Sequence, residues 1–564
     1  MQDSSIIISQ HRKDKESSVK FKERRFAQWN ENYALHRDKV QTNRLTQRQP
    51  INVPITREAV QTWVSKLDTP PELSFESRGN ENKDKDGEIL LNELWQYYYD
   101  TIGLDVIDYV EKKIVGLQGR GFKKWGFSNG KIFCDLIDPY DIEIDPRANP
   151  LDINGTADFI KHTHIYKSLR NILANKDYSD AAKLELKIFL DSSQGILRSK
   201  QDYDAYENKK ERLQNLGAQN YDDFTYGDVI VELNESYKNV WHDDIKQFVR
   251  HFMVIAADTV VLLDKPMKDA LGLSRIPIVT WASDPDINDI WSDGIADSVR
   301  TFNKITNMYL SQDLENRTYR NFGMYFFNTM NGQFTPQAFE PKPFGMYPVP
   351  GNPAEIVKQV DIQPLNDTSN QISWLKDLIQ SSVAQTATER GEVKSDTTLG
   401  QTQLSFQQSQ GRTQVVTRLY MKAWKESGEI FYELLKNNSA GTMKLFKRGS
   451  NNKMFSKDVV KSDWDFPAGY ECRVVSKEEK DVASDFSLKQ IQYVKNSFAT
   501  NPVALRIAKR KELELLDWSK EDIDSVMQAE GNSGMPYNPV QDAPSIKNNP
   551  QDNPLQTNAA SMKA

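Results

Sequence analysis

Two groups of closely spaced carboxylates are the first residues whose types and spacing could bind a metal ion. The segment DPDIND, Asp284 to Asp289, has the alternating acids of the start of a calcium loop. Asp289, however, stands where that loop needs its tight-turn glycine, and Ile295 stands where it needs its closing glutamate. We therefore favour a second interpretation, in which these acids precede a long helix whose N-terminal dipole favours negative charge.

The second acidic group lies on a predicted strand. Asp141, Glu143 and Asp145 in DIEIDP fall on one face at a period of two, and here we favour a solvated strand face over a metal site. His162 and His164 would also share a strand face, but ordinary surface or core histidines are favoured over a two-ligand site. The sequence therefore predicts no metal ion and no cofactor.

Catalytic and nucleotide-binding motifs are missing from the sequence. GLQGRGFKKW, from Gly116, comes nearest to a Walker loop and lacks its Lys-Ser/Thr at the required spacing. There is no G-x-S-x-G elbow, and the carboxylates are too numerous for spacing to nominate a general acid and base. We predict that the protein is not an enzyme. A carboxylate-dependent hydrolase stays open as an alternative and would need a concave site with converging acids.

The bulk composition limits the classes of protein further. With 564 residues, 38% of them apolar and 27% charged, the chain suits several ordered domains or one elongated subunit. Its net charge of −7 gives no basic footprint, so any DNA contact must be local or weak. The longest apolar runs are too short to span a bilayer, and the N-terminus has no signal-peptide core, so we expect a cytoplasmic protein.

The two cysteines, Cys134 and Cys472, fit a reducing compartment. We favour two buried thiols, with a disulfide between them as the open alternative.

The elements that must position any functional residue alternate between helices and strands. The pattern predicts a frayed stretch up to residue 18, an amphipathic helix over 19–40, and a helical region over 88–117 that Gly103 splits. Asn129-Gly130 predicts a tight hairpin, and three strands in a meander end near Pro266. The fold class is therefore α+β and rich in helix.

The second half of the chain has a different organisation. A strand leads into a long helix from about Ser292, with Ser292 and Asp293 as candidate caps, and a segment rich in aromatic residues and proline follows. A helix restarts at Asn370. The polar stretch ATERGEVKSDTTLGQTQ then leads into another long helix, whose first third is largely Gln, Ser, Thr and Gly. That polar third has no apolar face that could pack into a normal hydrophobic core.

The order of elements from Ile276 to Asn438 resembles that of portal proteins, the head-to-tail connectors of tailed bacteriophages. The matching features are IPIVTWASDPDINDIWSDGIADSVRTFNKITNMYLSQDLENRTYRN, the β-rich insertion, the returning helix and the polar loop. RRFAQWNENYALHRDKV and LIDPYDIEIDP also look like portal wing segments. The resemblance implies a structural protein without catalytic activity that forms a dodecameric ring around an axial channel, through which double-stranded DNA is packaged and ejected.

The resemblance also implies an elongated subunit with wing, stem, clip and crown regions. The expected regions are a flexible N-terminus (1–18), an α+β wing (19–291), a stem helix (292–320), a β-rich clip (321–369), a second stem helix (370–387), a tunnel loop (388–399), a long wing helix (400–438), an upper wing or crown (439–529) and a flexible C-terminal tail (530–564).

The partners and location that it implies are those of a virion component. The ring would occupy one capsid vertex after assembly in the host cytoplasm, contact the scaffold and major capsid proteins, and dock the terminase and then head-completion adaptor or tail proteins. Its contact with DNA would be transient and non-specific.

The tunnel loop carries the residues expected to meet DNA. A channel that gripped many phosphates would stall a moving duplex, so sparse basic positions beside neutral polar ones are the useful composition. Ordinary solvated side chains are the alternative interpretation. The candidate channel residues are Arg390, Lys394, Ser395, Asp396, Thr397, Thr398 and Arg412.

The clip carries more aromatic residues than about fifty residues need for a private core, which favours an interface between clips and with docking partners. A β-rich subdomain of a monomeric scaffold or adaptor protein is the alternative. The candidate interface residues are Phe322, Tyr325, Phe326, Phe327, Phe334, Phe339, Phe344 and Tyr347.

Overall fold

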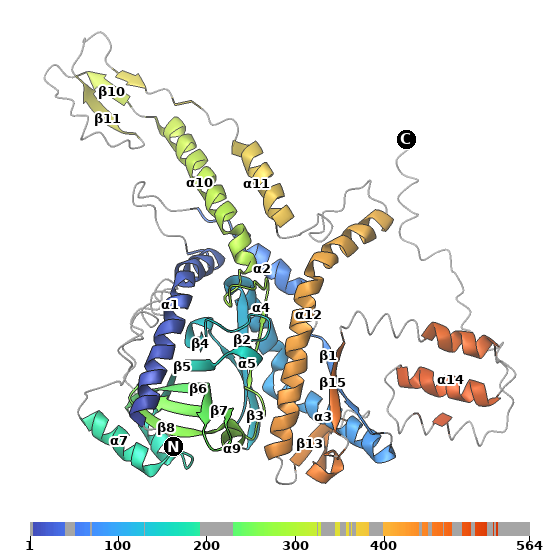
Figure 1. The fold of residues 1–564 in the computed structure, drawn as a ribbon. Coiled ribbons are helices and arrows are strands. Elements are labelled where there is room, and N and C mark those ends of the chain that lie inside the picture. The colour runs from blue at the N-terminus through green and yellow to red at the C-terminus, as the bar shows by residue number, and fades with distance from the viewer. Residues whose placement is uncertain are drawn as a thin grey trace. The chain divides into compact units, whose positions relative to one another are not determined.

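The chain mixes helix and sheet and divides into two compact units, Met1–Val475 and Ser476–Ala564 (Figure 1). The predicted α+β class is confirmed at this level. The computed structural model describes residues 4–39, 51–67, 70–79, 81–128, 130–191, 229–323, 325–328, 344–349, 357–359, 362–363, 368–382, 399–438, 443–448, 454–465, 467, 469–475, 488–497, 502–515, 523 and 526–527.

A five-stranded antiparallel sheet organises the first part of the larger unit. Its strands follow chain order: β4 (Ile142–Ile144), β5 (Phe159–Ser168), β6 (Ile230–His242), β7 (Gln247–Ala256) and β8 (Val260–Pro266). The predicted meander ending near Pro266 is confirmed, because β6, β7 and β8 pair in sequence. Around the sheet lie the 3-10 turn Pro139–Asp141 and the short helices α5 (Ile153–Thr156), α6 (Leu169–Ala174), α7 (Asp180–Asp191) and α9 (Met267–Leu271).

Helix α1 (Ser4–His36) packs against this sheet, and its N-terminal half differs from the flexible segment predicted over residues 1–18. Ile7 packs with Met253 and Ile255 of β7. The buried face farther along the helix is polar, which hid it from a search for apolar periodicity. The buried residues of this face are His11, Lys15, Ser18 and Lys22.

The polar face of α1 is held by the turn between β7 and β8. Asp258 accepts hydrogen bonds from His11 Nε2 at 2.9 Å and from Lys15 Nζ at 2.8 Å. Burial alone raises the pKa of Asp258, but these two bonds hold it well below its usual range. Burial lowers the pKa of His11 to about 4, so this imidazole is neutral near pH 7 and donates its Nε2 proton.

A three-stranded sheet lies beside the first, with β2 (Arg120–Ser128) between β3 (Lys131–Ile137) and β9 (Ile278–Ala282). Ser128 pairs with Lys131, so β2 and β3 are joined by two residues, and Gly130 has a φ of +78°. This confirms the hairpin predicted from Asn129-Gly130, because a tight turn of this kind needs positive φ.

Helices and two short sheets enclose the largest hydrophobic core. Trp95 lies at its centre, with its ring centroid 6.2 Å from that of Trp424 and 5.0 Å from that of Phe431. Gly103, at φ +72°, separates the two helices that the sequence predicted. The three-stranded sheet β3-β2-β9 contributes to this core as well. The other contributing elements are α2 (Ile55–Lys66), α3 (Asn82–Ile102), α4 (Leu104–Gln118), α12 (Leu399–Asn438), β1 (Glu72–Ser77) paired with β15 (Tyr470–Val475), and β13 (Met443–Arg448) paired with β14 (Met454–Val459), which the 3-10 turn Lys461–Asp463 follows.

The two cysteines are both buried and free, as favoured from the sequence.

Helix α10 (Ile295–Phe322) leaves this body, and α11 (Thr368–Ser382) returns beside it (Figure 1). Between them lies a three-stranded sheet in the order β11 (Met346–Val349), β10 (Tyr325–Asn328), β12 (Val357–Gln359). The predicted succession of a helix, a β-rich insertion and a helix is present. The bounds differ, because α10 begins three residues after Ser292 and includes Phe322, which was assigned to the insertion.

The smaller unit contains a helix at 488–497 and α14 (Pro502–Leu515), joined by an ion pair between Lys495 and Glu512. The predicted flexible tail, 530–564, lies outside the described residues.

Candidate functional site

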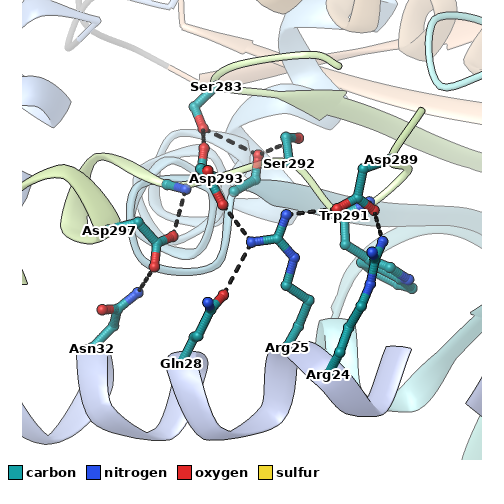
Figure 2. Close-up of polar contacts among 12 residues, drawn as sticks. Arg24, Arg25, Gln28, Asn32, Ser283, Asp289, Trp291, Ser292, Asp293 and Asp297 are labelled. Carbon is teal, nitrogen blue, oxygen red and sulfur yellow. Dashed lines mark hydrogen bonds and ion pairs between the residues drawn. The ribbon is translucent and has the colours of Figure 1, made fainter. Parts of the chain in front are cut away.

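The junction at which α10 leaves the body is the most densely bonded polar region near the predicted stem (Figure 2). The first turn of α10 is set by Asp297, whose Oδ2 accepts the backbone N–H of Gly294 at 2.9 Å. Asp297 Oδ1 accepts from Asn32 Nδ2 of α1 at 3.0 Å. One carboxylate thus satisfies an unpaired donor at the helix start and ties that start to α1.

The predicted caps, Ser292 and Asp293, have other partners. Ser292 Oγ donates to the backbone carbonyl of Gly119 at 3.3 Å, and Asp293 pairs with Arg25 of α1. The cap itself is Gly294, in extended backbone. The acids of this segment do precede the helix as expected, and two of them, Asp289 and Asp293, bind the cationic side chain of Arg25.

Arg25 is the central cation of this junction. Its guanidinium reaches Asp289 Oδ2 at 2.6 Å and also pairs with Asp293 (Figure 2). Arg24 contacts the other oxygen of Asp289 at 2.6 Å. Burial alone lowers the pKa of Arg25, but its bonds to the two carboxylates raise it above the ordinary value. Both carboxylate oxygens of Asp289, the residue in the glycine position of the calcium-loop pattern, therefore pair with arginine side chains.

Farther along α10, a second set of polar contacts joins it to the first turn of α2 and to the segment before that helix. Asn303 Nδ2 donates to Thr56 Oγ1 at 2.9 Å, and both side chains are buried. Asn307 donates to Asn52 Oδ1 at 2.8 Å and accepts the backbone N–H of Val53 at 2.9 Å. These amides are directional, so they fix the rotation of α10 about its own axis as well as its position.

Beyond these contacts, α10 and α11 leave large apolar side chains in solvent. Met308 is 48% exposed, Leu314 is 53% exposed, and Trp374 of α11 is 61% exposed. In contrast, Val299 at the base of α10 is fully buried beside Ile379 of α11. The pair is thus packed at its base and carries unburied apolar surface away from it.

The other acids and histidines singled out from the sequence do not form a metal site. Glu143 and Asp145 are buried, contrary to the solvated face favoured for them, and Asp145 accepts the backbone N–H groups of Arg147 and Asp158. His162 and His164 do not continue one regular strand, because the pairing of β5 shifts register there. Among the described residues, no three or more His, Cys, Asp or Glu side chains are grouped to hold a metal ion.

Two of the predicted clip residues lie together. Phe322 ends α10 and Phe344 precedes β11, with ring centroids 4.7 Å apart. Phe344 remains 65% exposed, and the neighbouring Met346 is 70% exposed. Only the backbone of four further candidates is described, while Phe334 and Phe339 lie outside the described residues. Those four are Tyr325, Phe326 and Phe327 in β10 and Tyr347 in β11.

The candidate channel residues lie almost entirely outside the described part of the chain. Arg412 belongs to α12, where its backbone alone is described. The residues outside it are Arg390, Lys394, Ser395, Asp396, Thr397 and Thr398.

Sequence reasoning missed the role of α1 at the junction. Arg25, Trp29 and Asn32 stand at i, i+4 and i+7, which places them on one helix face. Trp29 is buried against Trp291, with ring centroids 5.4 Å apart, directly between the two polar contacts. The sequence signal that could have indicated this contact was a tryptophan with a polar residue on each side of it along one helix face.

The sequence matches no protein family model and no curated protein. Within the described residues, no helix has the length and apolar character that crossing a bilayer requires.

Proposed function

We propose that this chain is the subunit of a viral portal: a ring at one capsid vertex through which double-stranded DNA is packaged and later ejected. The proposal rests on the resemblance in element order, and one structural observation supports it most. The helix pair α10 and α11 is fixed at its base and exposes large apolar residues beyond it, among them Leu314 and Trp374.

Such surface fits contact with further copies of the chain. In a ring closed by heterologous contacts, each subunit buries one side of its helices against the next. In a single copy of the chain, the side chains of Met308, Leu314 and Trp374 are about half exposed or more. In a ring, the α10–α11 pairs of neighbouring subunits would cover them. The exposed Phe344 and Met346 next to β11 would add contacts between clips or with docking proteins.

The remaining parts of the proposal follow from the portal assignment. We place the segment 388–399 in the channel, with weak and non-specific contact to DNA. The ring would hold twelve subunits, be located in the virion and carry no catalytic activity. It would bind scaffold and major capsid proteins during assembly, the terminase during packaging, and adaptor or tail proteins afterwards.

Assembly can be tested on the purified full-length chain by mass photometry and negative-stain imaging. We expect closed rings, and a stable monomer at all salt concentrations would overturn the proposal. Leu314→Asp should abolish rings while leaving the stability of the monomer within about 0.5 kcal/mol, because the side chain is exposed in one copy. Gln312→Glu, an exposed polar position on the same helix, serves as the matched control.

A monomeric scaffold or adaptor protein would use the same apolar surface for a different partner, and the assembly test separates it from a portal. A carboxylate-dependent hydrolase needs accessible acids. Asp108 and Glu111 are two buried acids one turn apart on α4; Asp108 contacts Lys112 at 2.7 Å, and Glu111 contacts Lys123 at 3.1 Å. Their near-complete burial supports a structural role, in which Glu111 joins α4 to β2 and Asp108 accepts a hydrogen bond from Tyr420 of α12.

A further inference from the structure

Three titratable side chains of the five-stranded sheet, one each from β6, β7 and β8, contact one another in a row. His242 of β6 and His251 of β7 place their Nε2 atoms 2.7 Å apart. On its other side, His251 Nδ1 lies 2.6 Å from Asp264 Oδ1 of β8. Each of three adjacent strands thus contributes one member.

The contact with Asp264 fixes the tautomer of His251. A carboxylate accepts hydrogen bonds and does not donate them, so the ring proton of His251 is on Nδ1. Its Nε2 then presents a lone pair toward His242. A histidine that donates one ring N–H to a carboxylate and offers the other nitrogen is the usual arrangement of a metal-ligating imidazole.

The second imidazole is aimed at the same point. The ring centroids of His242 and His251 are 4.9 Å apart, with 42° between the ring planes. The rings are therefore not stacked flat, and their nitrogen atoms face each other. His251 is buried, whereas His242 is only partly buried beside the exposed hairpin residues 243–246, which leaves a path for an ion from solvent.

We propose that His242 and His251 bind a divalent transition metal ion of the zinc, nickel or copper class. The metal binds the Nε2 lone pairs of both rings; the proton on Nε2 of His242 is released to water, and the neutral His242 ring carries its one proton on Nδ1 instead. The two Nε2 atoms, 2.7 Å apart without the metal, move apart to admit it, because zinc–nitrogen bonds are about 2.0 to 2.1 Å long. Imidazole nitrogen suits these metals better than calcium or magnesium. Because no third His, Cys, Asp or Glu joins the pair among the described residues, water completes the coordination.

The local charges are compatible with a bound cation. Asp264 supplies a negative charge behind His251. Lys238 pairs with His251 across the strands, but its ammonium group contacts Asp14 Oδ2 at 2.5 Å and is directed to α1. The ammonium group of Lys238 is therefore already compensated.

Metal binding can be measured by calorimetric titration of zinc chloride into the metal-free full-length chain. We expect binding and a raised unfolding temperature, because an ion that binds only the folded chain stabilises it. His242→Ala should abolish both effects. Gln247→Ala, directly opposite His242 in the β6–β7 register, should preserve both effects. Cu²⁺ added to the wild-type chain should give an electron paramagnetic resonance signal with hyperfine coupling to two imidazole nitrogens.

The role of Asp264 provides a second measurement. Asp264→Asn keeps an acceptor for His251 but removes the charge, so zinc affinity should fall roughly 10-fold to 100-fold while the chain remains folded. The inference is overturned if wild type binds no zinc, or if His242→Ala binds zinc as wild type does; the histidines would then be a hydrogen-bonded strand contact only. Ring formation is a separate measurement, so either proposal can fail alone.

Discussion

At the scale of single residues, the packing of α1 against the five-stranded sheet and the turn before β4 depends on buried charges that have hydrogen-bond partners. Lys22 illustrates this, because its ammonium group donates to the carbonyls of Tyr140 and Ile142, each at 2.8 Å, and to that of Pro139 at 3.3 Å. A buried cation without such acceptors would be costly. Substitutions on this face should therefore be more damaging than their polarity suggests.

Arg25 and Arg24 make a matched pair for testing the junction. Arg25→Ala removes bonds to two carboxylates from a site whose side chain is 14% exposed, and we expect a loss of about 2 kcal/mol in unfolding free energy. Arg24→Ala removes one ion pair from a side chain that is 50% exposed, and should cost less than about 1 kcal/mol. Urea unfolding measures both, and a larger loss for Arg24→Ala would contradict the assignment of Arg25 as the central cation.

His162 should make stability depend on pH. Burial, helped by the Lys124 cation, lowers its pKa from 6.5 to about 4. The unfolded chain then binds a proton at higher pH than the folded chain does. The stability that neutral His162 contributes is therefore complete above pH 6.5 and is lost as the pH falls toward 4.

The variant His162→Gln cannot lose stability in this way. From pH 8 to pH 5, its unfolding free energy should fall by about 1 to 2 kcal/mol less than that of wild type. Urea midpoints at several pH values measure the difference. Parallel curves for the two proteins would show that His162 is not buried in its neutral form.

At the scale of elements, the segment before α10 meets the start of β2 at Gly119. A Cβ on Gly119, which has φ +86°, would lie 1.7 Å from the carbonyl oxygen of Ser292. Gly103 also has positive φ, at +72°, but its Cβ would come no nearer than 4.0 Å to Asp105. Substitution of Gly103 therefore tests backbone strain alone, whereas substitution of Gly119 tests strain together with a steric clash.

Gly103→Ala should cost about 1 kcal/mol, the strain of a left-handed alanine. Gly119→Ala adds a clash with backbone that cannot move aside, so it should cost several-fold more or yield little folded protein. Thermal unfolding and soluble yield measure the two effects. Equal losses would mean that the β2 and α10 starts are not packed together.

The elements that could be predicted from the sequence were those specified by local signals. Asn129-Gly130 gave the hairpin, Gly103 gave the helix break, and alternation gave the meander. The N-terminal half of α1 was missed because its buried face is polar and depends on Asp258, 247 residues beyond His11. The junction contacts were missed for the same reason, since their partners are distant along the chain.

At the scale of the whole molecule, assembly and DNA contact should be separable. Deleting residues 389–398, within the proposed tunnel loop, should leave ring assembly intact and impair DNA packaging or retention. Imaging of rings and measurement of packaged DNA test the two effects. The matched control is replacement of the same residues by a Gly/Ser segment of equal length. Loss of folding in the deletion variant would mean that the segment is a core connector.

The long sequence separation within the α1 contacts also bears on synthesis of the chain. Asn32 leaves the ribosome 265 residues before Asp297, a delay of roughly a quarter of a minute to a minute at ordinary translation rates. During that time α1 gains its partners one after another, and Asp258, which binds His11 and Lys15, is made only near the end. From His11 to Lys22 its future buried face carries His11, Lys15, Ser18 and Lys22, which water solvates well, in place of an apolar stripe that would promote aggregation. The polar face that holds α1 in the folded subunit therefore also limits aggregation of this helix during synthesis.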